Sequence, residues 1–358
     1  MNREEHLRLL RENIDSLDEQ ILYLLNKRAE VVIEIGKIKS EIYMESYDQV
    51  REQEIFDSLK TKNSGPLPES AIDHIFCEII SACRSLVKKN KIAYLGPPAS
   101  YSHLACVENF GNSIEAISKE NIDEVFEAIE KGEVEFGVVP IENSIEGVVN
   151  RTLDMFIEYD VKICGEIFLK ISHCLISLSV NPNGIRNIYS HPQALGQCRK
   201  WLKKNYPKAQ FIETFSTAKA AEIASKEKES AAIASPIAAK LYGLKILNSH
   251  IEDSAHNYTR FFLIGLKTQN RTGKDKTSIL FSIRHVPGSL YKVLKNFSEN
   301  GINLTKIESR PIKGRPWEYF FFIDFEGHIE DPEVNKLLLE LKEQVIFLKI
   351  LGSYPRRQ

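Results

Sequence analysis

The first side chain that suggests chemistry is an arginine in an apolar seam. Apolar residues recur every three or four positions from Leu10 to Ile42, and Arg28 is the one interruption of the series. This periodicity predicts a single long helix, because the segment contains no proline and only Gly36 is a weak helix former. A guanidinium in such a seam needs an anion to offset its desolvation. The position therefore indicates either a carboxylate in the seam or an anionic ligand.

Other cations could share that ligand. Lys39 follows Arg28 by eleven residues, which at about 100° per residue returns it to nearly the same face. Arg11 precedes Arg28 by seventeen residues, roughly 25 Å along the axis, too far to hold the same small molecule from one helix. A ninety-residue domain cannot cover so long a rod with its own chain. We therefore expect an intertwined homodimer in which Arg11 comes from the other subunit.

Two shorter amphipathic helices are expected to follow, at about 47–62 and 68–87. The first of them begins with Asp48, Arg51 and Glu52 on one side. Taken alone, these charges are typical of a solvated face. Together with LREN, IDSLD and NKRAEVVIEIGKIK, however, the segment YDQVREQE resembles the all-α chorismate mutase family. The active-site residues that this resemblance implies are Arg11, Arg28, Lys39, Asp48, Arg51 and Glu52.

The mutase reaction explains why cations would dominate such a site. Chorismate is a dianion that rearranges within itself, so the enzyme need only hold it coiled and stabilise charge on the breaking ether oxygen. The resemblance assigns Lys39 to that oxygen, and Arg11 and Arg28 to the carboxylates. Val87 stands where the family usually has a Gln or Glu donor, and Cys83 stands for a family serine. Losing one donor costs on the order of 3 kcal/mol in the transition state. This predicts a slow mutase, unless the third helix aligns one turn differently.

The periodicity changes after residue 91. Short apolar strands now alternate with helical segments, which predicts an α/β domain with a mainly parallel sheet over 91–271. Ligands bind such sheets where loops leave the carboxyl ends of the strands. The loops at these ends are rich in hydroxyl and amide groups, and they cover 96–103, 140–144, 189–193 and 257–261. Singly, each is weak: Ser102 could cap a helix, and Asn143 could close a turn.

Taken in order, five segments of this region resemble prephenate dehydratase: YLGPPASYSHLA, GVVPIENSIEGVVNRTLD, YSHPQALGQCRKWL, AAIASPIAAKLYG and NYTRFFLIG. The resemblance implies a bilobal, periplasmic-binding-protein-like fold with the active site between the lobes. Thr259 matches the essential family threonine, and it would donate or relay a hydrogen bond to the departing ring hydroxyl. The further implied cleft residues are Ser102, Glu142, Asn143, Ser190 and Gln193. Arg260 would either bind a substrate carboxylate or brace the loop.

The last segment, 275–358, has the pattern β-α-β-β-α-β of a ferredoxin-like module. The motifs VPGSLYKVL and GINLTKIESRP resemble the ACT regulatory domain, which binds phenylalanine across a dimer interface. Gly288 lets a ligand approach the backbone, and the positive end of a helix starting at Ser289 suits a carboxylate. Inhibition requires phenylalanine to favour the inactive arrangement by about 1–3 kcal/mol. The implied effector residues are Pro287, Gly288, Ser289, Leu290, Asn303, Leu304, Glu308, Ser309, Arg310 and Pro311.

Length and composition limit the alternatives. The 358 residues allow two or three domains, which we expect at 1–90, 91–271 and 275–358. The net charge of −2 gives no support for a nucleic-acid partner. No apolar run approaches the ~18 residues of a membrane helix, and the charged N-terminus lacks a signal-peptide core, so we expect a cytoplasmic protein. The scattered cysteines and histidines, with no dinucleotide or P-loop fingerprint, predict no metal and no cofactor.

The resemblances together predict a homodimeric or homotetrameric enzyme that converts chorismate to prephenate and prephenate to phenylpyruvate, under feedback inhibition by phenylalanine. Two alternatives stay open. One is a monofunctional dehydratase acting on prephenate or arogenate, with a weak mutase-like domain, since no residue distinguishes a keto from an amino side chain. The other is a non-catalytic amino-acid sensor, against which Thr259 and the cation set argue.

Overall fold

The structure is a computed structural model, and it describes residues 3–42, 47–179, 181, 184–254, 256–312 and 317–357. The chain divides into two compact units. The first comprises 1–90 with 107–115, and the second comprises 91–106 with 116–358. None of the helices in the described part of the chain is both long and apolar enough to cross a bilayer.

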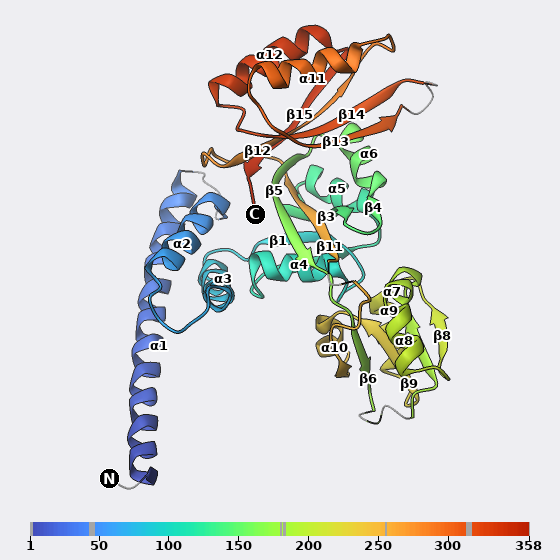
Figure 1. Ribbon diagram of the computed structural model, residues 1–358. Coiled ribbons are helices and arrows are strands. Elements are labelled where there is room, and N and C mark those ends of the chain that lie inside the picture. The colour runs from blue at the N-terminus through green and yellow to red at the C-terminus, as the bar shows by residue number, and fades with distance from the viewer. Residues whose placement is uncertain are drawn as a thin grey trace. The chain divides into compact units, whose positions relative to one another are not determined.

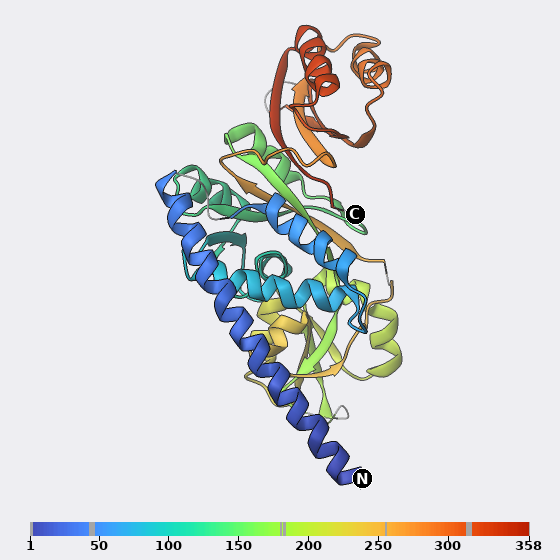
Figure 2. The same ribbon diagram turned by 90° about the vertical axis from the view of Figure 1, so that its left-hand side faces the viewer.

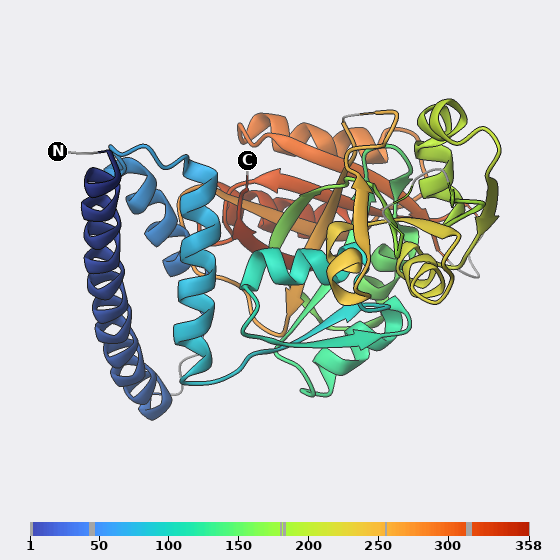
Figure 3. The same cartoon turned by 90° about the horizontal axis from the view of Figure 1, so that it is seen from below.

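The first unit is built on three helices, α1 (Arg3–Glu41), α2 (Gln49–Lys62) and α3 (Glu69–Ser85). The expected single long helix is confirmed, and α1 runs for 39 residues without interruption. It extends well past the other two helices (Figure 2) and lies beside α3 (Figure 3). Asp48 caps α2 by accepting a hydrogen bond from the Arg51 backbone N–H at 3.0 Å. No residue of α1 is buried, so its apolar seam faces outward within this unit.

The larger lobe of the second unit is a mixed sheet in the order β2-β1-β3-β11-β5, with β4 (Gly147–Val148) paired to β3. Its strands are β1 (Lys91–Leu95), β2 (Glu115–Lys119), β3 (Phe136–Asn143), β5 (Lys162–Lys170) and β11 (Tyr258–Gly265). The helices of this region are α4 (Tyr101–Phe110), α5 (Ile122–Glu130) and α6 (Asn150–Glu158). Its core contains a row of three aromatic rings. The ring centroid of Phe156 lies 5.1 Å from that of Phe126 and 6.1 Å from that of Phe262.

The smaller lobe is a second mixed sheet in the order β10-β6-β9-β7-β8. Its strands are β6 (Cys174–Ser177), β7 (Asn187–Ser190), β8 (Gln210–Glu213), β9 (Ser230–Ala234) and β10 (Lys245–Asn248). Its helices are α7 (Pro192–Gln197), α8 (Arg199–Asn205), α9 (Thr217–Ala224) and α10 (Pro236–Leu241). Alanines fill one of its cores, which lets α9 and α10 pack closely on the sheet. The chain crosses between the lobes twice, at 171–173 and at 249–257.

The expectation of a mainly parallel sheet is wrong. Parallel pairs include β1 with β3, β7 with β8, and β7 with β9. In contrast, β11 is antiparallel to both β3 and β5, and β6 is antiparallel to both β9 and β10. The two crossings explain the difference. The chain leaves the larger lobe along β5 and returns along β11, so these neighbours must run in opposite directions.

The C-terminal region has the expected β-α-β-β-α-β order. It consists of β12 (Asp275–Ser282), α11 (Ser289–Glu299), β13 (Leu304–Pro311), β14 (Tyr319–Glu326), α12 (Pro332–Gln344) and β15 (Phe347–Pro355). The strands form one sheet in the order β13-β14-β12-β15, and both helices cover the same face of it (Figure 1). Phe322 and Tyr354 on the other face join the core of the larger lobe. The second unit therefore has a continuous core from the dehydratase-like sheet to the C-terminal sheet.

Candidate functional sites

The first unit contains a cavity of about 140 Å³ between its three helices. Five of the six residues implied for the mutase site line it, and Arg11, exposed on α1, is the exception. The lining residues are Arg28, Val32, Ile35, Gly36, Lys39, Asp48, Arg51, Glu52, Ile80, Arg84 and Val87. The structure thus brings together cations from α1 and acidic residues from the start of α2. Helix spacing predicted only that Arg28 and Lys39 share a face, and the resemblance implied the α2 residues.

Positive charge is in excess in this cavity. Four cationic side chains line it with two carboxylates, and one of those carboxylates, on Glu52, is already paired with Arg84. Nη1 of Arg28 is buried and has no hydrogen-bond partner among the described residues. A buried, unpartnered donor of a cation is costly unless a ligand satisfies it. This arrangement suits an anionic ligand with more than one carboxylate.

Arg84 is a cavity residue that the sequence analysis missed. Its side chain is only 8% exposed and lies over the Tyr47 ring, 5.0 Å from the centroid. Nη2 of Arg84 also donates to the Phe110 carbonyl at 2.9 Å. These contacts hold the guanidinium against Glu52. The only sequence signal was a cation within the apolar stretch IISACRSL of the third helix.

Val87 lies in the wall of the same cavity, where the resemblance implies a polar donor. Its side chain packs so closely on α1 that a Cβ added at Gly36 would lie 2.4 Å from Val87 Cγ1. The wall is therefore apolar at this point, and Gly36 makes room for the valine. The donor that the family usually carries here is absent from this position.

Replacing Val87 with glutamine is expected to raise the mutase kcat by roughly tenfold, because an amide donor would then reach the ligand cavity. A well-placed donor of this kind usually changes kcat by about 10²- to 10³-fold. We expect a smaller gain here, because the residues around position 87 do not hold a glutamine in one orientation. The rate of chorismate consumption measures the effect. Leu86→Gln is the matched control, because the neighbouring side chain is 60% exposed. Equal rates in the two variants would contradict this account of position 87.

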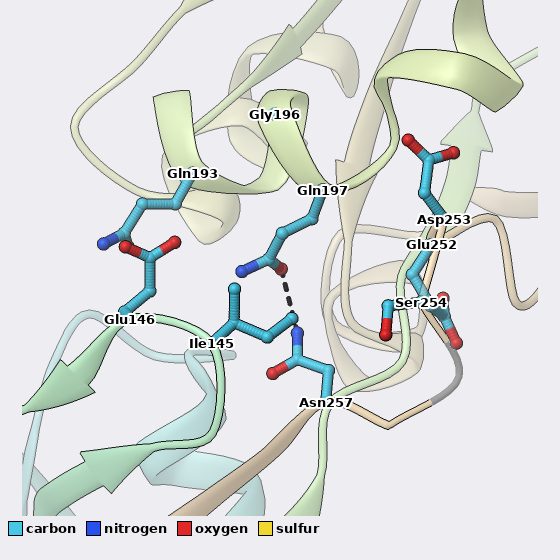
Figure 4. Close-up of a pocket in the computed structure, with 9 residues that line it drawn as sticks. All are labelled: Ile145, Glu146, Gln193, Gly196, Gln197, Glu252, Asp253, Ser254 and Asn257. Carbon is cyan, nitrogen blue, oxygen red and sulfur yellow. Dashed lines mark hydrogen bonds between the residues drawn. The ribbon is translucent and has the colours of Figure 1, made fainter.

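The second unit contains a larger cavity, of about 330 Å³, where the two lobes meet. Its wall combines the β3-β4 turn, α7 and the returning crossing, and Figure 4 shows the side chains that line it. They are Ile145, Glu146, Gln193, Gly196, Gln197, Glu252, Asp253, Ser254 and Asn257. Backbone N–H groups already occupy two of its carboxylates: Glu252 accepts from His173 at 2.9 Å, and Asp253 accepts from Lys200 at 2.9 Å.

Thr259 is not among the lining residues and is two hydrogen bonds from this wall, by way of Asn143. Asn143 Nδ2 donates to Thr259 Oγ1 at 2.8 Å and to Oδ1 of the wall residue Asn257 at 2.9 Å. The amide of Asn143 cannot be reversed, because its Oδ1 accepts from the backbone N–H groups of Ile145 and Glu146. Thr259 Oγ1 is therefore an acceptor from Asn143, and its own O–H remains to donate. Thr259 is 9% exposed.

The other implied cleft residues lie in different surroundings. Gln193 lines the cavity. Ser190 Oγ donates to the Ile233 carbonyl at 2.7 Å and is fully buried. Ser102 is buried in the first turn of α4. Glu142 accepts from Lys306 Nζ of β13 at 2.5 Å. Ser102, Ser190 and Glu142 are not among the lining residues of this cavity.

Arg260 is not among the lining residues of the cavity, which bears on the two alternatives left open for it, substrate binding and bracing. Its guanidinium donates to Glu166 Oε2 at 2.9 Å and to Asp324 Oδ2 at 2.6 Å, and all three residues are buried. Burial opposes the charge of Arg260, but Asp324, Tyr354 and Glu166 outweigh it, and its pKa is raised. A guanidinium held by two carboxylates has no site left for a substrate carboxylate. The geometry favours the other alternative, a bracing role.

Gln197 and Asn257 are cavity residues that the sequence analysis did not single out. Both stood within quoted motifs, YSHPQALGQ and NYTRF. Gln197 follows Gln193 by four residues, which places both on one side of α7. That spacing was the signal that would have found Gln197. The described residues include no group of three or more His, Cys, Asp or Glu side chains arranged to hold a metal ion.

The C-terminal region carries the residues implied for phenylalanine, in the turn before α11, at the start of α11 and along β13. Gly288 has φ of 83° and immediately precedes α11, which starts at Ser289 as expected. Pro287 and Leu290 flank this turn, while Asn303 and Leu304 stand at the start of β13. The segment of β13 that includes Glu308, Ser309, Arg310 and Pro311 pairs with β14. Arg310 donates to Asp154 of α6 at 2.9 Å, so it binds the larger lobe of its own chain.

Three family models match consecutive regions of the chain: chorismate mutase type II at 10–88, prephenate dehydratase at 92–269 and the ACT domain at 277–343. The bifunctional chorismate mutase/prephenate dehydratase of Aquifex aeolicus is 51% identical over 356 residues, which is 98% of each chain. The chain belongs to the bifunctional chorismate mutase/prephenate dehydratase family. It is therefore an enzyme with a chorismate mutase domain and a prephenate dehydratase domain, and it carries an ACT domain.

Solved structures share the fold of the dehydratase and ACT regions. The prephenate dehydratase of Arthrobacter aurescens, solved in complex with L-Phe, is 33% identical with a TM-score of 0.69, over 74% of this chain and 90% of that one. GqqA, described as a novel type of quorum-quenching acylase, is 32% identical with a TM-score of 0.69, over 75% of this chain and 98% of that one. Because one fold serves different reactions, the near full-length relatives decide the family here.

Proposed function

We propose that the two reactions of this family proceed at the two cavities, and that phenylalanine bound to the ACT domain inhibits the dehydratase. The observation that carries the dehydratase assignment is the fixed Asn143 amide, which leaves the Thr259 O–H free to donate. The expected domain limits, 1–90, 91–271 and 275–358, belong to the same proposal.

In the dehydratase step, the substrate would bind in the cavity between the lobes with its leaving hydroxyl beside Thr259. The bond to the ring carboxylate breaks, and its electron pair enters the ring as carbon dioxide leaves. As that pair enters the ring, the C–O bond breaks with its own pair, and the oxygen departs as water with a proton taken from solvent. A hydrogen bond from Thr259 to that oxygen stabilises the charge developing on it. The chain's residues act here by position and by donation.

In the mutase step, Arg28 and Lys39 would hold the dianion in its coiled form, and Lys39 would face the ether oxygen. The reaction is intramolecular and needs no general base.

The exposed face of α1 supports a dimer in which a second copy adds Arg11 to each cavity. A contiguous apolar stripe of this length is typical of a buried interface. Its residues are Leu10, Ile14, Leu17, Ile21, Leu24, Val31, Ile35, Ile38 and Ile42, with exposures between 46% and 63%.

Feedback inhibition is supported by contacts that join the ACT domain to the catalytic strands. Lys306 of β13 pairs with Glu142, the neighbour of Asn143 on β3. Asp324 of β14 pairs with Arg260, the neighbour of Thr259 on β11. The Arthrobacter aurescens relative was solved in complex with L-Phe. In this chain, phenylalanine bound at Gly288 and Ser289 would act through these strands. An effect of 5- to 150-fold on affinity is the usual range for such coupling.

The purified full chain, given chorismate, is expected to accumulate phenylpyruvate, and saturating phenylalanine is expected to slow that step but not the loss of chorismate. Arg28→Ala should stop chorismate consumption while prephenate is still converted. Separate assays with chorismate, prephenate and arogenate distinguish the full pathway from a monofunctional enzyme. Loss of both rates in Arg28→Ala, or indifference to phenylalanine, would refute the corresponding part of the proposal.

Replacing apolar residues of the α1 seam with charged ones is expected to dissociate the dimer and to lower the mutase kcat/KM. For Leu17→Glu with Ile21→Glu the loss should be about 10- to 100-fold, because each cavity loses the charged hydrogen bonds of Arg11. Analytical ultracentrifugation and the chorismate assay measure the two effects. Gln20→Glu, on an exposed position of the same helix outside the seam, is the matched control. A double variant that stays associated and keeps full mutase activity would contradict the dimer.

A further inference from the structure

A chain of hydrogen bonds crosses between the two lobes behind the dehydratase cavity. His173, at the outgoing crossing, places Nε2 2.8 Å from Gln197 Oε1 at the end of α7. Asn257, at the returning crossing, donates from Nδ2 to the same Gln197 oxygen at 2.9 Å. Asn257 is joined in turn to Asn143, and Asn143 to Thr259. The chain therefore links a buried histidine, by amide side chains alone, to the hydroxyl assigned to the reaction.

The direction of every bond in this chain is determined from its Asn143 end. Two backbone N–H groups bind Asn143 Oδ1, so its Nδ2 must donate to Asn257 Oδ1. Asn257 is then left with Nδ2 as a donor, and the acceptor that it meets is Gln197 Oε1. Because that oxygen cannot donate, the ring nitrogen facing it, His173 Nε2, must carry the hydrogen.

The surroundings of His173 agree with this tautomer. Its Nδ1 lies 2.9 Å from the Tyr101 hydroxyl, which also donates to the Ser172 carbonyl at 2.9 Å, so the one hydroxyl hydrogen is shared between two acceptors. The side chain is 2% exposed, and burial lowers the pKa of His173 below its usual value. A neutral ring with hydrogen on Nε2 satisfies Gln197 and leaves Nδ1 as an acceptor that competes with the Ser172 carbonyl for the Tyr101 hydrogen.

We propose that His173 is a positioning residue of the dehydratase site, which holds Gln197 Oε1 away from the cavity and thereby presents the Gln197 amide N–H groups to the substrate. Figure 4 shows this orientation, with the Gln197 oxygen on the Asn257 side and the nitrogen on the side of Ile145. The Gln197 amide then faces the cavity, and the Thr259 hydroxyl lies behind Asn257 of its wall, joined to it through Asn143. This inference rests on the proposed dehydratase site and extends it to a residue that does not line the cavity.

The physical reason is that a glutamine amide can turn over at little steric cost. With the His173 donor removed, a single bond from Asn257 would hold Gln197 Oε1, and the reversed amide would place an oxygen against a substrate carboxylate. That reversal replaces an attraction with a repulsion. In the native protein, His173 and Asn257 both donate to Gln197 Oε1. Turning the amide over is then unfavourable, because both buried donors would lose their acceptor.

His173→Leu is expected to lower the dehydratase kcat/KM by about 10- to 100-fold. This is the usual effect of losing one buried hydrogen bond, here the bond from His173 that orients the Gln197 amide. His173→Gln, which keeps an N–H near the Nε2 position, is expected to recover most of that loss. Mutase activity, measured on the same preparation, should be unchanged and serves as the folding control. If His173 only filled space in the core, His173→Gln would not recover the dehydratase kcat/KM better than His173→Leu.

A double-mutant cycle separates positioning from general destabilisation. In a Gln197→Met background there is no amide to orient, so His173→Leu should lower kcat/KM by less than about threefold further. An equally large loss in that background overturns the proposal, as does full activity of His173→Leu in the parent. Thr259→Val is assayed alongside: if it stays active, the proposed role of Thr259 fails, whatever the histidine variants do.

Nitrogen-15 NMR of the unaltered protein tests the same inference, with one variant needed only to assign the signal. With ¹⁵N-labelled histidine at pH 7, His173 is expected to be protonated on Nε2 and unprotonated on Nδ1. Comparison with His173→Gln assigns its signal among the nine histidines. The Nδ1–H tautomer would overturn the proposal, because Gln197 would then have to turn its nitrogen toward the ring.

Discussion

Replacing Thr259 with valine is expected to lower the kcat for phenylpyruvate formation from prephenate by about 10²- to 10³-fold. Valine keeps the shape of threonine and removes only the hydroxyl, so the change isolates the donor. Asn143 Nδ2 loses one acceptor but retains Asn257 Oδ1, and it remains near the Tyr258 carbonyl at 3.3 Å. The fixed amide should therefore stay in place, and the loss should fall on the chemical step. Steady-state kinetics with prephenate measure it.

Thr259→Ser is the matched control for this prediction. It restores the hydroxyl at the same backbone position, next to the same Asn143 amide, and should keep activity within about tenfold of the parent. The mutase rate, which depends on a different cavity, should be the same in both variants. A valine variant that dehydrates prephenate at the parental rate would show that another group assists the leaving oxygen.

The long helix and two of its cavity residues were predictable, because both depend on the spacing of residues along one helix. The seam of α1 and the offset between Arg28 and Lys39 follow from helix geometry alone, and both side chains do line one cavity. Arg84 was not predictable in the same way. Its role depends on Tyr47, on Glu52 and on the carbonyl of Phe110, which lies 26 residues away and outside the three helices. Contacts of that kind leave no periodic pattern in the sequence.

The dehydratase region shows a similar limit. The strands and their loops could be located from apolar runs, but the direction of β11 depends on a crossing between lobes that no local pattern reveals. The side chain of Arg260 illustrates the consequence. Its two carboxylate partners lie 94 and 64 residues away, on β5 and β14, so the sequence left ligand binding and bracing equally open. Only the tertiary contacts favour bracing.

The cluster around Arg260 leads to the second large expected effect. Glu166, fully buried, accepts from Arg260 and from Lys276 Nζ, the latter at 3.0 Å, while Asp324 accepts from Arg260 and from Ser278. Two cations and two carboxylates thus neutralise one another between the sheets of the dehydratase and ACT regions. Replacing Glu166 with glutamine is expected to lower the free energy of unfolding by about 3–5 kcal/mol, because two buried cations would then share one carboxylate.

Denaturant unfolding of the full chain measures this loss, and Glu229→Gln is the control. Glu229 pairs with Arg186 at 3.0 Å on the surface, where water screens both charges, so its change should stay within about 0.5 kcal/mol.

A second variant tests whether charge balance, and not the number of contacts, determines the stability of the cluster. Glu166→Gln combined with Lys276→Met removes one cation together with the carboxylate and leaves Arg260 paired with Asp324. Balance predicts that the double variant is more stable than Glu166→Gln alone, although it has fewer hydrogen bonds. If contacts alone mattered, the second substitution would add to the loss. The sign of the difference between the two variants therefore decides between the two explanations.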